Sequence, residues 1–218
     1  MRYYLDDLSV ILPTYQENHN VISKLVSQLR LRKIQVIVVD DGSDKPYPRS
    51  IKHGANFGYG GALLTGIKNA TRPLIITMDA DGQHNINDVL NLYKAWNMIG
   101  NADMIIGSRR LVGKERWYRM LGRKFLNFVA SCMTGQYFQD LNSGMRIFRR
   151  DIAIGYAPVL CRTFSFTTSL TISMLCDGYR VESFPINVGN RKYGGSKVRL
   201  LRHGLVTIWY ILFLGIVF

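Results

Sequence analysis

The chain has 218 residues, of which 47% are apolar and 20% charged, so it can build a globular domain with a sizeable core and is not a disordered chain. Its formal net charge of +13 lies in the second half, because residues 1–108 hold 11 basic and 10 acidic side chains and residues 109–218 hold 17 and 5. We therefore expect an anionic partner, such as a phosphate compound or an anionic membrane, to bind the second half. Three cysteines at wide spacings support neither a disulfide framework nor a zinc site.

The first half alternates short apolar runs with helical patterns. Continuous runs rich in Val and Ile predict buried strands at Ser9–Leu12, Gln35–Val39, Leu74–Met78 and Met104–Ile106. Apolar residues at helical spacing predict helices over Asn18–Arg32, Gly60–Ala70 and Asn87–Ile99, and Asn18 is placed to cap the first of them. We therefore expect an α/β domain with a largely parallel sheet, which binds ligands beyond the carboxyl ends of its strands.

Polar residues follow each of the four predicted strands, and the segment after the third strand carries two carboxylates. Asp79 and Asp81 stand at positions i and i+2, which places them on the same side of an extended chain, close enough to share a cation. Oxygen ligands from this pair and Gln83 suit Mg²⁺ or Mn²⁺, which would neutralise a departing diphosphate. The alternative is that these acids cap a helix or face solvent.

Two further loops of the first half are candidates for nucleotide contacts. The segment Asp40–Ser43 forms a turn in any interpretation, and its two acids could accept hydrogen bonds from a nucleobase or from ribose hydroxyls. The glycines of Asn56–Ala62 invite comparison with the dinucleotide motif G-x-G-x-x-G, but Leu63 stands at its last position and no strand directly precedes it. A tight loop entering a helix, or a backbone passing close to a nucleotide, is favoured instead.

The second half is less regular. Trp117–Met133 has apolar residues at helical spacing beside several arginines, which is typical of a core-facing helix or of an interfacial helix on lipid. Met145–Phe148 and Arg180–Val188 alternate as strands do, and Asn190–Lys197 is a basic loop with two glycines that could form a lid over phosphate or a solvated loop. Leu205–Phe218 contains no charge over 14 residues, fewer than the roughly 20 that span a bilayer, so it would dip into the membrane, begin a longer span, or form a core helix.

Seven motifs in one order over Leu8–Lys197 carry a resemblance: PTYQE, DDGSD, NFGYGGA, DADGQH, GSR, DLNSGMR and RKYGGSK. The series closely resembles family 2 glycosyltransferases of the GT-A fold, and within them the dolichol-phosphate (polyprenyl-phosphate) mannosyltransferase-like group. It implies a GT-A catalytic domain over residues 1–204, with residues 205–218 as an apolar membrane-associating or truncated transmembrane segment. Two mild departures are Gln16, where the family usually has Asn, and Met145, where Phe is commoner.

The resemblance also implies an activity. It would be inverting transfer of a hexose, above all mannose from GDP-mannose, to a membrane polyprenyl or dolichyl phosphate at the cytoplasmic face of a membrane. The nucleotide sugar would be held by Pro13, Tyr15, Glu17, Asp41 and Asp79, and the Mg²⁺ or Mn²⁺ ion by Asp79, Asp81 and Gln83. Donor or acceptor phosphates would meet Arg109, Arg123, Ser143, Arg191 and Lys197. Catalytic roles would fall to Asp81, Arg109, Asp140 and Arg191, with Asp140 mainly orienting the acceptor site.

Three other functions are compatible with parts of the sequence. A nucleotidyltransferase, or another nucleotide-sugar enzyme with UDP-glucose or UDP-N-acetylglucosamine as donor or with a soluble acceptor, would share the carboxylates and the sheet. A processive polysaccharide synthase should carry a Q-x-x-R-W motif, whereas Gly113 stands at the first position before Arg116 and Trp117. The charge alone would suit a nucleic-acid-binding protein, but no RNA-binding signature is present and the acidic strand ends would repel a phosphate backbone, so we expect no nucleic-acid partner.

Overall fold

The computed structural model describes residues 4–110, 124, 127–132, 134–138, 140–187, 209, 210 and 213. The strands are β1 (Leu8–Thr14), β2 (Gln35–Asp40), β3 (Ile51–Lys52), β4 (Leu74–Thr77), β5 (Met104–Arg110), β6 (Arg146–Arg149) and β7 (Val181–Asn187). The helices are α1 (His19–Arg30), α2 (Tyr59–Asn69), α3 (Ile86–Ile99), α5 (Arg150–Gly155) and α6 (Phe166–Cys176), and a 3₁₀ turn η1 covers Leu5–Asp7.

All seven strands form one sheet in the order β3-β2-β1-β4-β6-β5-β7. Strand β6 runs antiparallel to both of its neighbours, whereas the other four strand pairs are parallel. The predicted largely parallel α/β sheet is therefore confirmed. The carboxyl ends of β1, β2, β4 and β5 meet at one edge together with the beginning of β6.

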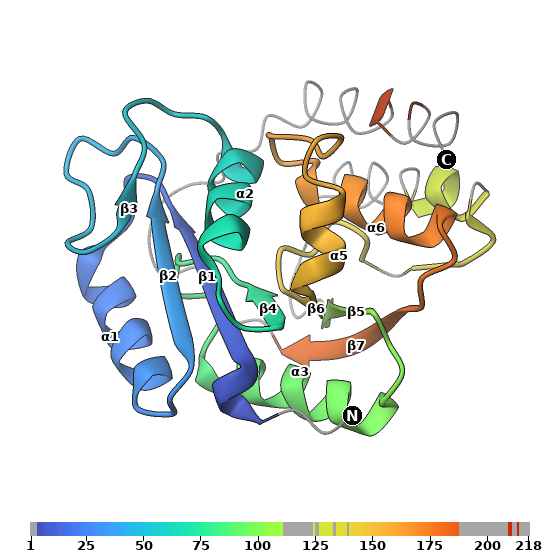
Figure 1. Ribbon diagram of the computed structural model, residues 1–218, viewed down its shortest axis with the longest axis horizontal. Coiled ribbons are helices and arrows are strands. Elements are labelled where there is room, and N and C mark those ends of the chain that lie inside the picture. Colours follow the sequence, from blue (N-terminus) through green and yellow to red (C-terminus); the bar gives the residue numbers. More distant parts are fainter. Residues whose placement is uncertain are drawn as a thin grey trace.

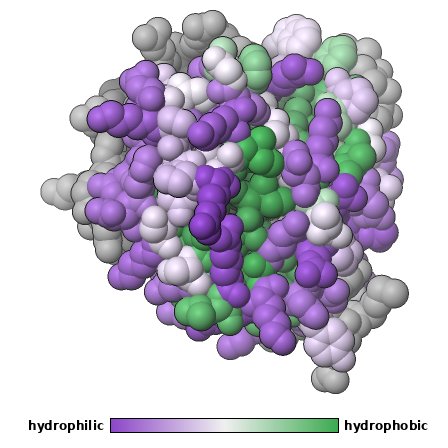
Figure 2. Space-filling view, turned by 60° about the vertical axis from the view of Figure 1, so that its left-hand side comes forward, coloured by the Kyte–Doolittle hydropathy of each residue, from purple (hydrophilic) through white to green (hydrophobic). Residues whose placement is uncertain are grey.

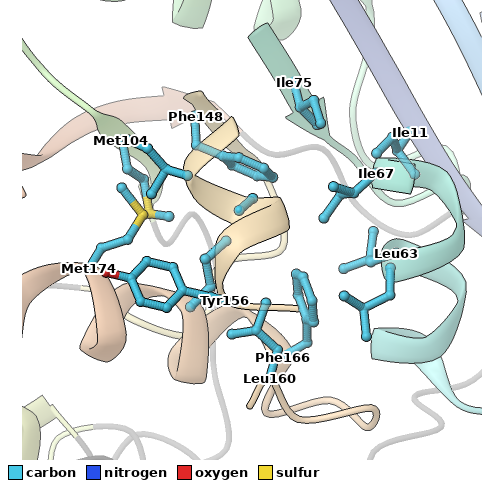
Figure 3. Close-up of a cluster of buried hydrophobic side chains, with 14 of the residues drawn as sticks. Ile11, Leu63, Ile67, Ile75, Met104, Phe148, Tyr156, Leu160, Phe166 and Met174 are labelled. Carbon is cyan, nitrogen blue, oxygen red and sulfur yellow. The ribbon is translucent and has the colours of Figure 1, made fainter. Parts of the chain in front are cut away.

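Helices cover both faces of this sheet (Figure 1). Helices α1 and α3 pack on one face, and α2, α5 and α6 pack on the other. Successive residues of β1 alternate between the two cores, so Ile11 meets Leu63 and Ile67 of α2 (Figure 3) while Val10 and Leu12 face the α1 side. Each fully buried side chain of this size contributes roughly 1.5–3 kcal/mol to folding, so both layers hold the strand ends firmly in place.

Helix α2 lies directly on β1 because its contact residue has no side chain. A Cβ at Gly66 would come within 2.4 Å of the Cγ2 atom of Ile11, so any larger residue there would push the helix away from the sheet. The N-terminus of α2 leads to the carboxyl edge of the sheet, where Tyr59 begins the helix. This close packing fixes the position of Tyr59 relative to the strand ends.

The sheet edge at β2 is only partly covered by β3, since β3 pairs with Val39 and Asp40 alone. Figure 2 shows the side of the molecule that carries this edge, with apolar surface at the bottom of a furrow bordered by hydrophilic side chains. The sequence does not predict β3, because a strand of two residues has no recognisable alternation. A small cavity lies beside β2, and its lining includes Arg30, Val38, Tyr47 and Arg49.

Several expectations fall outside the described part of the chain. Of the predicted helix Trp117–Met133, the structure describes residue 124 and residues 127–132, and these are helical. The basic loop Asn190–Lys197 and most of residues 205–218 are not described, so the membrane-associating segment and the domain boundary at residue 204 stay predictions. No helix within the described ranges combines the length and the apolarity needed to cross a bilayer.

Candidate active site

A cavity of about 660 Å³ opens at the carboxyl edge of the sheet. It brings together the ends of β1, β2, β4 and β5, the start of α2, the segment before β6, and the region around the start of α6. Its lining includes Pro13, Thr14, Tyr15, Glu17, Asp41, Asn56, Gly58, Tyr59, Asp79, Asp81, Gln83, Arg109, Asn142, Gly144, Phe164 and Thr167. Eight residues predicted from sequence therefore meet in one cavity, which is what the strand-end argument requires.

The carboxylates of Asp79 and Asp81 lie at the centre of the cavity lining, directly after β4. Asp81 is buried, and its Oδ1 accepts a hydrogen bond from the backbone N–H of Gln83 at 3.0 Å. Burial, followed by the nearby negative charge of Asp81, raises the pKa of Asp79, although His84 acts in the opposite direction. Two carboxylates placed side by side away from solvent repel each other and destabilise the fold unless a positive charge lies nearby. The pair therefore suits a divalent cation.

The ligand atoms of these side chains also fit a hard cation. Asp79, Asp81 and Gln83 offer only oxygen as side-chain ligand atoms, which Mg²⁺ and Mn²⁺ prefer. In the described part of the chain, no cluster of three or more His, Cys, Asp or Glu side chains could hold a metal by itself. The remaining ligands would therefore come from substrate phosphate and water, as is usual for Mg²⁺ bound with a nucleotide.

Tyr59 is a site residue that the sequence analysis missed. Its hydroxyl donates to Oδ1 of Asp79 at 3.0 Å, and its ring stacks on Phe164 with centroids 5.5 Å apart. Burial, together with Asp79, raises the pKa of Tyr59 well above its ordinary value, so the hydroxyl keeps its proton and donates. A Cβ at Gly144 would lie 2.8 Å from this hydroxyl, so glycine is needed beside the pair.

The loops after β1 and β2 form the other end of the cavity. The backbone N–H of Gln16 donates to the Ser43 hydroxyl at 2.8 Å, and the side-chain amide of Gln16 donates to the Asp44 carboxylate at 2.9 Å. Gln16 has a φ of 54°, a left-handed conformation in which Asn is more comfortable than Gln. This gives a physical reason why Asn is usual at that place in the family and why Gln16 is tolerated with two hydrogen bonds.

Arg109 reaches the cavity from the end of β5 and is held from behind by Asp140. Its Nε and Nη2 atoms donate to the two carboxylate oxygens of Asp140 at 2.6 and 2.9 Å. The Asp140 side chain is 3% exposed and the Arg109 side chain 36% exposed, so the carboxylate is buried while the guanidinium borders the opening. Asp140 does not line the cavity, and the structure therefore places it as a positioning residue for Arg109.

Replacing Asp140 by Asn should weaken the paired hydrogen bonds between residue 140 and the Arg109 guanidinium without removing both. Asn keeps one oxygen acceptor but loses the negative charge and one of the two side-chain hydrogen bonds, so the Arg109 guanidinium is held less firmly toward the cavity. We expect turnover to fall by about 10-fold or more, since a charged hydrogen bond contributes roughly 1.5–3 kcal/mol. Steady-state kinetics would measure this, with Asp103→Asn as a control because that carboxylate pairs with Arg149 outside the cavity. Equal losses in both variants would contradict the role of Asp140.

Ser143, predicted as a phosphate ligand, does not line the cavity in this structure. It is fully buried, and its hydroxyl donates to the Gly107 carbonyl at 2.6 Å, which ties the segment before β6 to β5, so its contact with a phosphate stays a prediction. Arg146 supports the same segment from inside the protein. Its guanidinium donates to the carbonyls of Leu141, Ser143 and Thr167 and is fully buried. Burial lowers the pKa of Arg146 to about 9, so it remains charged at neutral pH.

The remaining predicted phosphate ligands, Arg123, Arg191 and Lys197, lie outside the described residues. Their sites stay predictions. The residues that the sequence analysis did not single out for this cavity, chiefly Tyr59, Asn142, Phe164 and Thr167, come from loops and helix starts. The glycine-rich segment around Tyr59 and the motif DLNSGMR around Asn142 were the only sequence signals that could have pointed to them.

Comparisons with known proteins indicate which family the chain is similar to. Residues 9–156 match the family model described as glycosyl transferase family 2. The chain is 28% identical to polyprenol monophosphomannose synthase of Mycolicibacterium smegmatis, over 87% of this chain and 80% of that protein. It is 27% identical to undecaprenyl-phosphate mannosyltransferase of Micrococcus luteus, over 91% and 94% of the two chains.

A solved structure with the same fold is glucosyl-3-phosphoglycerate synthase from Mycobacterium tuberculosis, in complex with Mg²⁺ and UDP. It superposes with a TM-score of 0.75 at 15% identity and covers 95% of this chain and 78% of that one. At this identity the similarity establishes the fold, and the expected GT-A fold is thereby confirmed. Another crystal of that enzyme holds Mn²⁺, UDP-glucose and phosphoglyceric acid.

Proposed function

The chain belongs to glycosyl transferase family 2, and we propose that it moves a hexose from a nucleotide sugar to the phosphate of a membrane polyprenol or dolichol. One observation carries the proposal: a single cavity joins the carboxylates Asp79 and Asp81 to the guanidinium of Arg109. Such a cavity can take a diphosphate through a divalent cation and a second anion through the guanidinium. The acceptors in the names of the two mannosyl-transferring relatives support a polyprenyl phosphate as that second anion.

In the proposed reaction an oxygen of the acceptor phosphate attacks the anomeric carbon of the sugar. The bond from that carbon to the donor diphosphate breaks, its electron pair leaves with the nucleoside diphosphate, and the configuration inverts. A phosphate monoester has a second pKa of about 6, so it is largely dianionic at neutral pH and needs no protein base. This suits a cavity whose described lining contains carboxylates and an arginine but no histidine.

The chain's own residues divide into three groups in this proposal. Pro13, Tyr15, Glu17 and Asp41 form the end of the cavity that would hold the nucleoside. Asp79, Asp81 and Gln83 would hold Mg²⁺ or Mn²⁺, which when bound supplies positive charge against the departing diphosphate. Arg109, kept in orientation by Asp140, would bring two anionic substrates together, and Arg123, Arg191 and Lys197 would add to this from the undescribed segments.

We further propose that the protein works at the cytoplasmic face of a membrane and that residues 205–218 bring it there. Trp209 is 58% exposed and Phe213 is 37% exposed, and their rings stack with centroids 5.1 Å apart. Tyr210, between them in sequence, instead contacts Cys161 in the segment before α6. Exposed aromatic side chains are typical of proteins at the lipid headgroup region, where the acceptor phosphate also lies.

Deleting residues 205–218 should release the protein from membranes and lower activity on a long polyprenyl phosphate more than on a short soluble analogue. The double substitution Trp209→Ala and Phe213→Ala serves as a matched variant, because it removes the outward aromatic pair and keeps Tyr210 against Cys161. Vesicle flotation and rates on both acceptors would measure this. A deletion protein that unfolds, together with a double variant that still floats with vesicles, would show that the segment belongs to the core.

The donor is proposed as GDP-mannose on the family resemblance and on the mannosyl names of two relatives. The alternative donors UDP-glucose and UDP-N-acetylglucosamine keep support from the structural neighbour, which holds UDP. A donor screen with polyprenyl phosphate in vesicles, read as release of nucleoside diphosphate, separates the three. Rates on a water-soluble phosphorylated acceptor that exceed those on the lipid would overturn the proposed acceptor class.

A further inference from the structure

We propose that His53 is a positioning residue for the nucleotide-binding wall of the cavity, an inference that rests on the proposed function. His53 directly follows β3, and its side chain is 8% exposed. Its Nδ1 lies 2.7 Å from Oδ1 of Asp41, and its Nε2 lies 2.9 Å from the hydroxyl of Thr65 in α2. The imidazole therefore links the end of β2 to the helix that carries Tyr59 at its start.

The chemistry of the partners fixes which ring nitrogen carries the proton. An ionised carboxylate only accepts hydrogen bonds, so Nδ1 must donate to Asp41. In the neutral ring, Nε2 is then the acceptor and the Thr65 hydroxyl donates to it. His53 thus has a hydrogen-bond partner at both nitrogens, and its orientation is determined by two separate elements.

Asp41 connects the imidazole of His53 to the cavity wall by hydrogen bonds. Besides His53, its carboxylate accepts the backbone N–H groups of Phe57 at 2.9 Å and of Gly58 at 2.8 Å. Because Phe57 and His53 share the same oxygen, turning the carboxylate away from His53 would also strain the bond to Phe57. Gly58 and Asp41 both line the cavity, so the imidazole holds the wall through one carboxylate.

Close packing restricts the position of the loop from His53 to Gly58. The rings of His53 and Phe57 lie with centroids 4.9 Å apart. A Cβ at Gly42 would come within 2.8 Å of the backbone of Ala55, so the turn after Asp41 presses directly on the loop. Gly58 has a φ of 89°, which a side chain would disfavour. The wall is therefore built from close backbone contacts that depend on the hydrogen bonds of Asp41.

This arrangement predicts an effect on nucleotide affinity and little effect on the reacting centre. The wall held by His53 lies on the nucleoside side of the cavity, whereas Asp81 and Arg109 come from other strands. Loss of the imidazole should therefore raise KM for the donor and the Kd for nucleoside diphosphate, with kcat nearly unchanged. A merely structural role would lower the amount of folded enzyme instead, and KM would not move.

Three variants separate the two bonds of the imidazole. His53→Asn keeps a donor toward Asp41 and loses the bond to Thr65, Thr65→Val loses only that second bond, and His53→Leu loses both. The control is Tyr156→Phe, because the buried Tyr156 also makes a side-chain hydrogen bond, from its hydroxyl to the Asp177 carboxylate, but does not line the cavity. Calorimetry would measure binding of GDP and UDP with Mg²⁺, beside donor KM and kcat and the melting temperature.

We expect His53→Leu to weaken nucleotide binding by at least about tenfold, His53→Asn and Thr65→Val to weaken it less, and the control to bind as wild type. Nucleotide binding by His53→Leu equal to wild type, or an equal loss of binding in Tyr156→Phe, would overturn this inference and leave the proposed function standing. Should His53→Leu fail to fold, Thr65→Val decides the matter, and unchanged affinity in that variant would overturn the inference. Wild-type protein that binds neither nucleotide would overturn the proposed function itself.

Discussion

Replacing Asp81 by Asn should leave the fold intact and lower turnover by about 100- to 1000-fold, the loss typical of removing one preorganised charge contact. Asn has nearly the same shape as Asp and can still accept the Gln83 backbone hydrogen bond, so folding is little affected. It removes the negative charge that would hold the cation on the donor diphosphate. Turnover at saturating donor and Mn²⁺, beside the melting temperature, would measure both effects.

The matched control for this substitution is Asp88→Asn. Asp88 is also buried, but it caps the start of α3 by accepting the backbone N–H of Asn85 at 2.8 Å and does not line the cavity. We expect Asp88→Asn to lose stability with nearly normal turnover per folded molecule, the opposite pattern to Asp81→Asn. Full activity of Asp81→Asn, or of wild type in excess chelator, would contradict the metal site.

Replacing Arg146 by Lys should lower the free energy of unfolding by about 2–4 kcal/mol, because an ammonium cannot reach all the carbonyls that the guanidinium bonds. Lys would still bury a positive charge, so the desolvation free energy remains unfavourable. It would also leave at least one of the Leu141, Ser143 and Thr167 carbonyls without a hydrogen-bond donor. The segment before β6 would loosen, and Gly144 would no longer be held beside Tyr59 and Asp79.

Urea unfolding would measure this loss, with Arg149→Lys as control. Arg149 lies on the same strand, but its side chain is 43% exposed and its partners are the partly exposed Asp103 and the exposed Asp151, so its substitution should change the free energy of unfolding by less than about 1 kcal/mol. Equal unfolding midpoints for wild type and Arg146→Lys would show that the buried guanidinium does not hold the segment.

The strands that position the site could be predicted from sequence because they are buried on both faces. Continuous Val and Ile runs identify β1, β2, β4 and β5, and the polar residues that follow them identify much of the cavity lining. Helix α6 could not be predicted in this way. Its Thr and Ser residues are buried along with its apolar ones, so it has no polar face and no helical period of hydrophobicity.

The pairings within the site depend on contacts between distant parts of the chain. Asp140 and Arg109 are 31 residues apart, and Tyr59 and Asp79 are 20 apart, so no local pattern links them. Ser143 shows the converse. Its motif suggested a phosphate ligand, but the antiparallel pairing of β5 and β6 brings its buried hydroxyl to the Gly107 carbonyl. Sequence identifies chemically suitable residues, and the fold decides which of them reach the cavity.

The measurement that bears most directly on the proposed activity is the phosphorus spectrum and mass of the lipid after incubation with GDP-mannose, Mn²⁺ and the enzyme in vesicles. We expect the phosphate monoester of the polyprenol to become a diester and the lipid mass to rise by one hexosyl residue, with GDP released in equal amount. Wild-type enzyme that leaves the lipid phosphate a monoester with each of the three donors, while hexose appears on a soluble acceptor, would contradict the assignment of polyprenyl phosphate as the nucleophile.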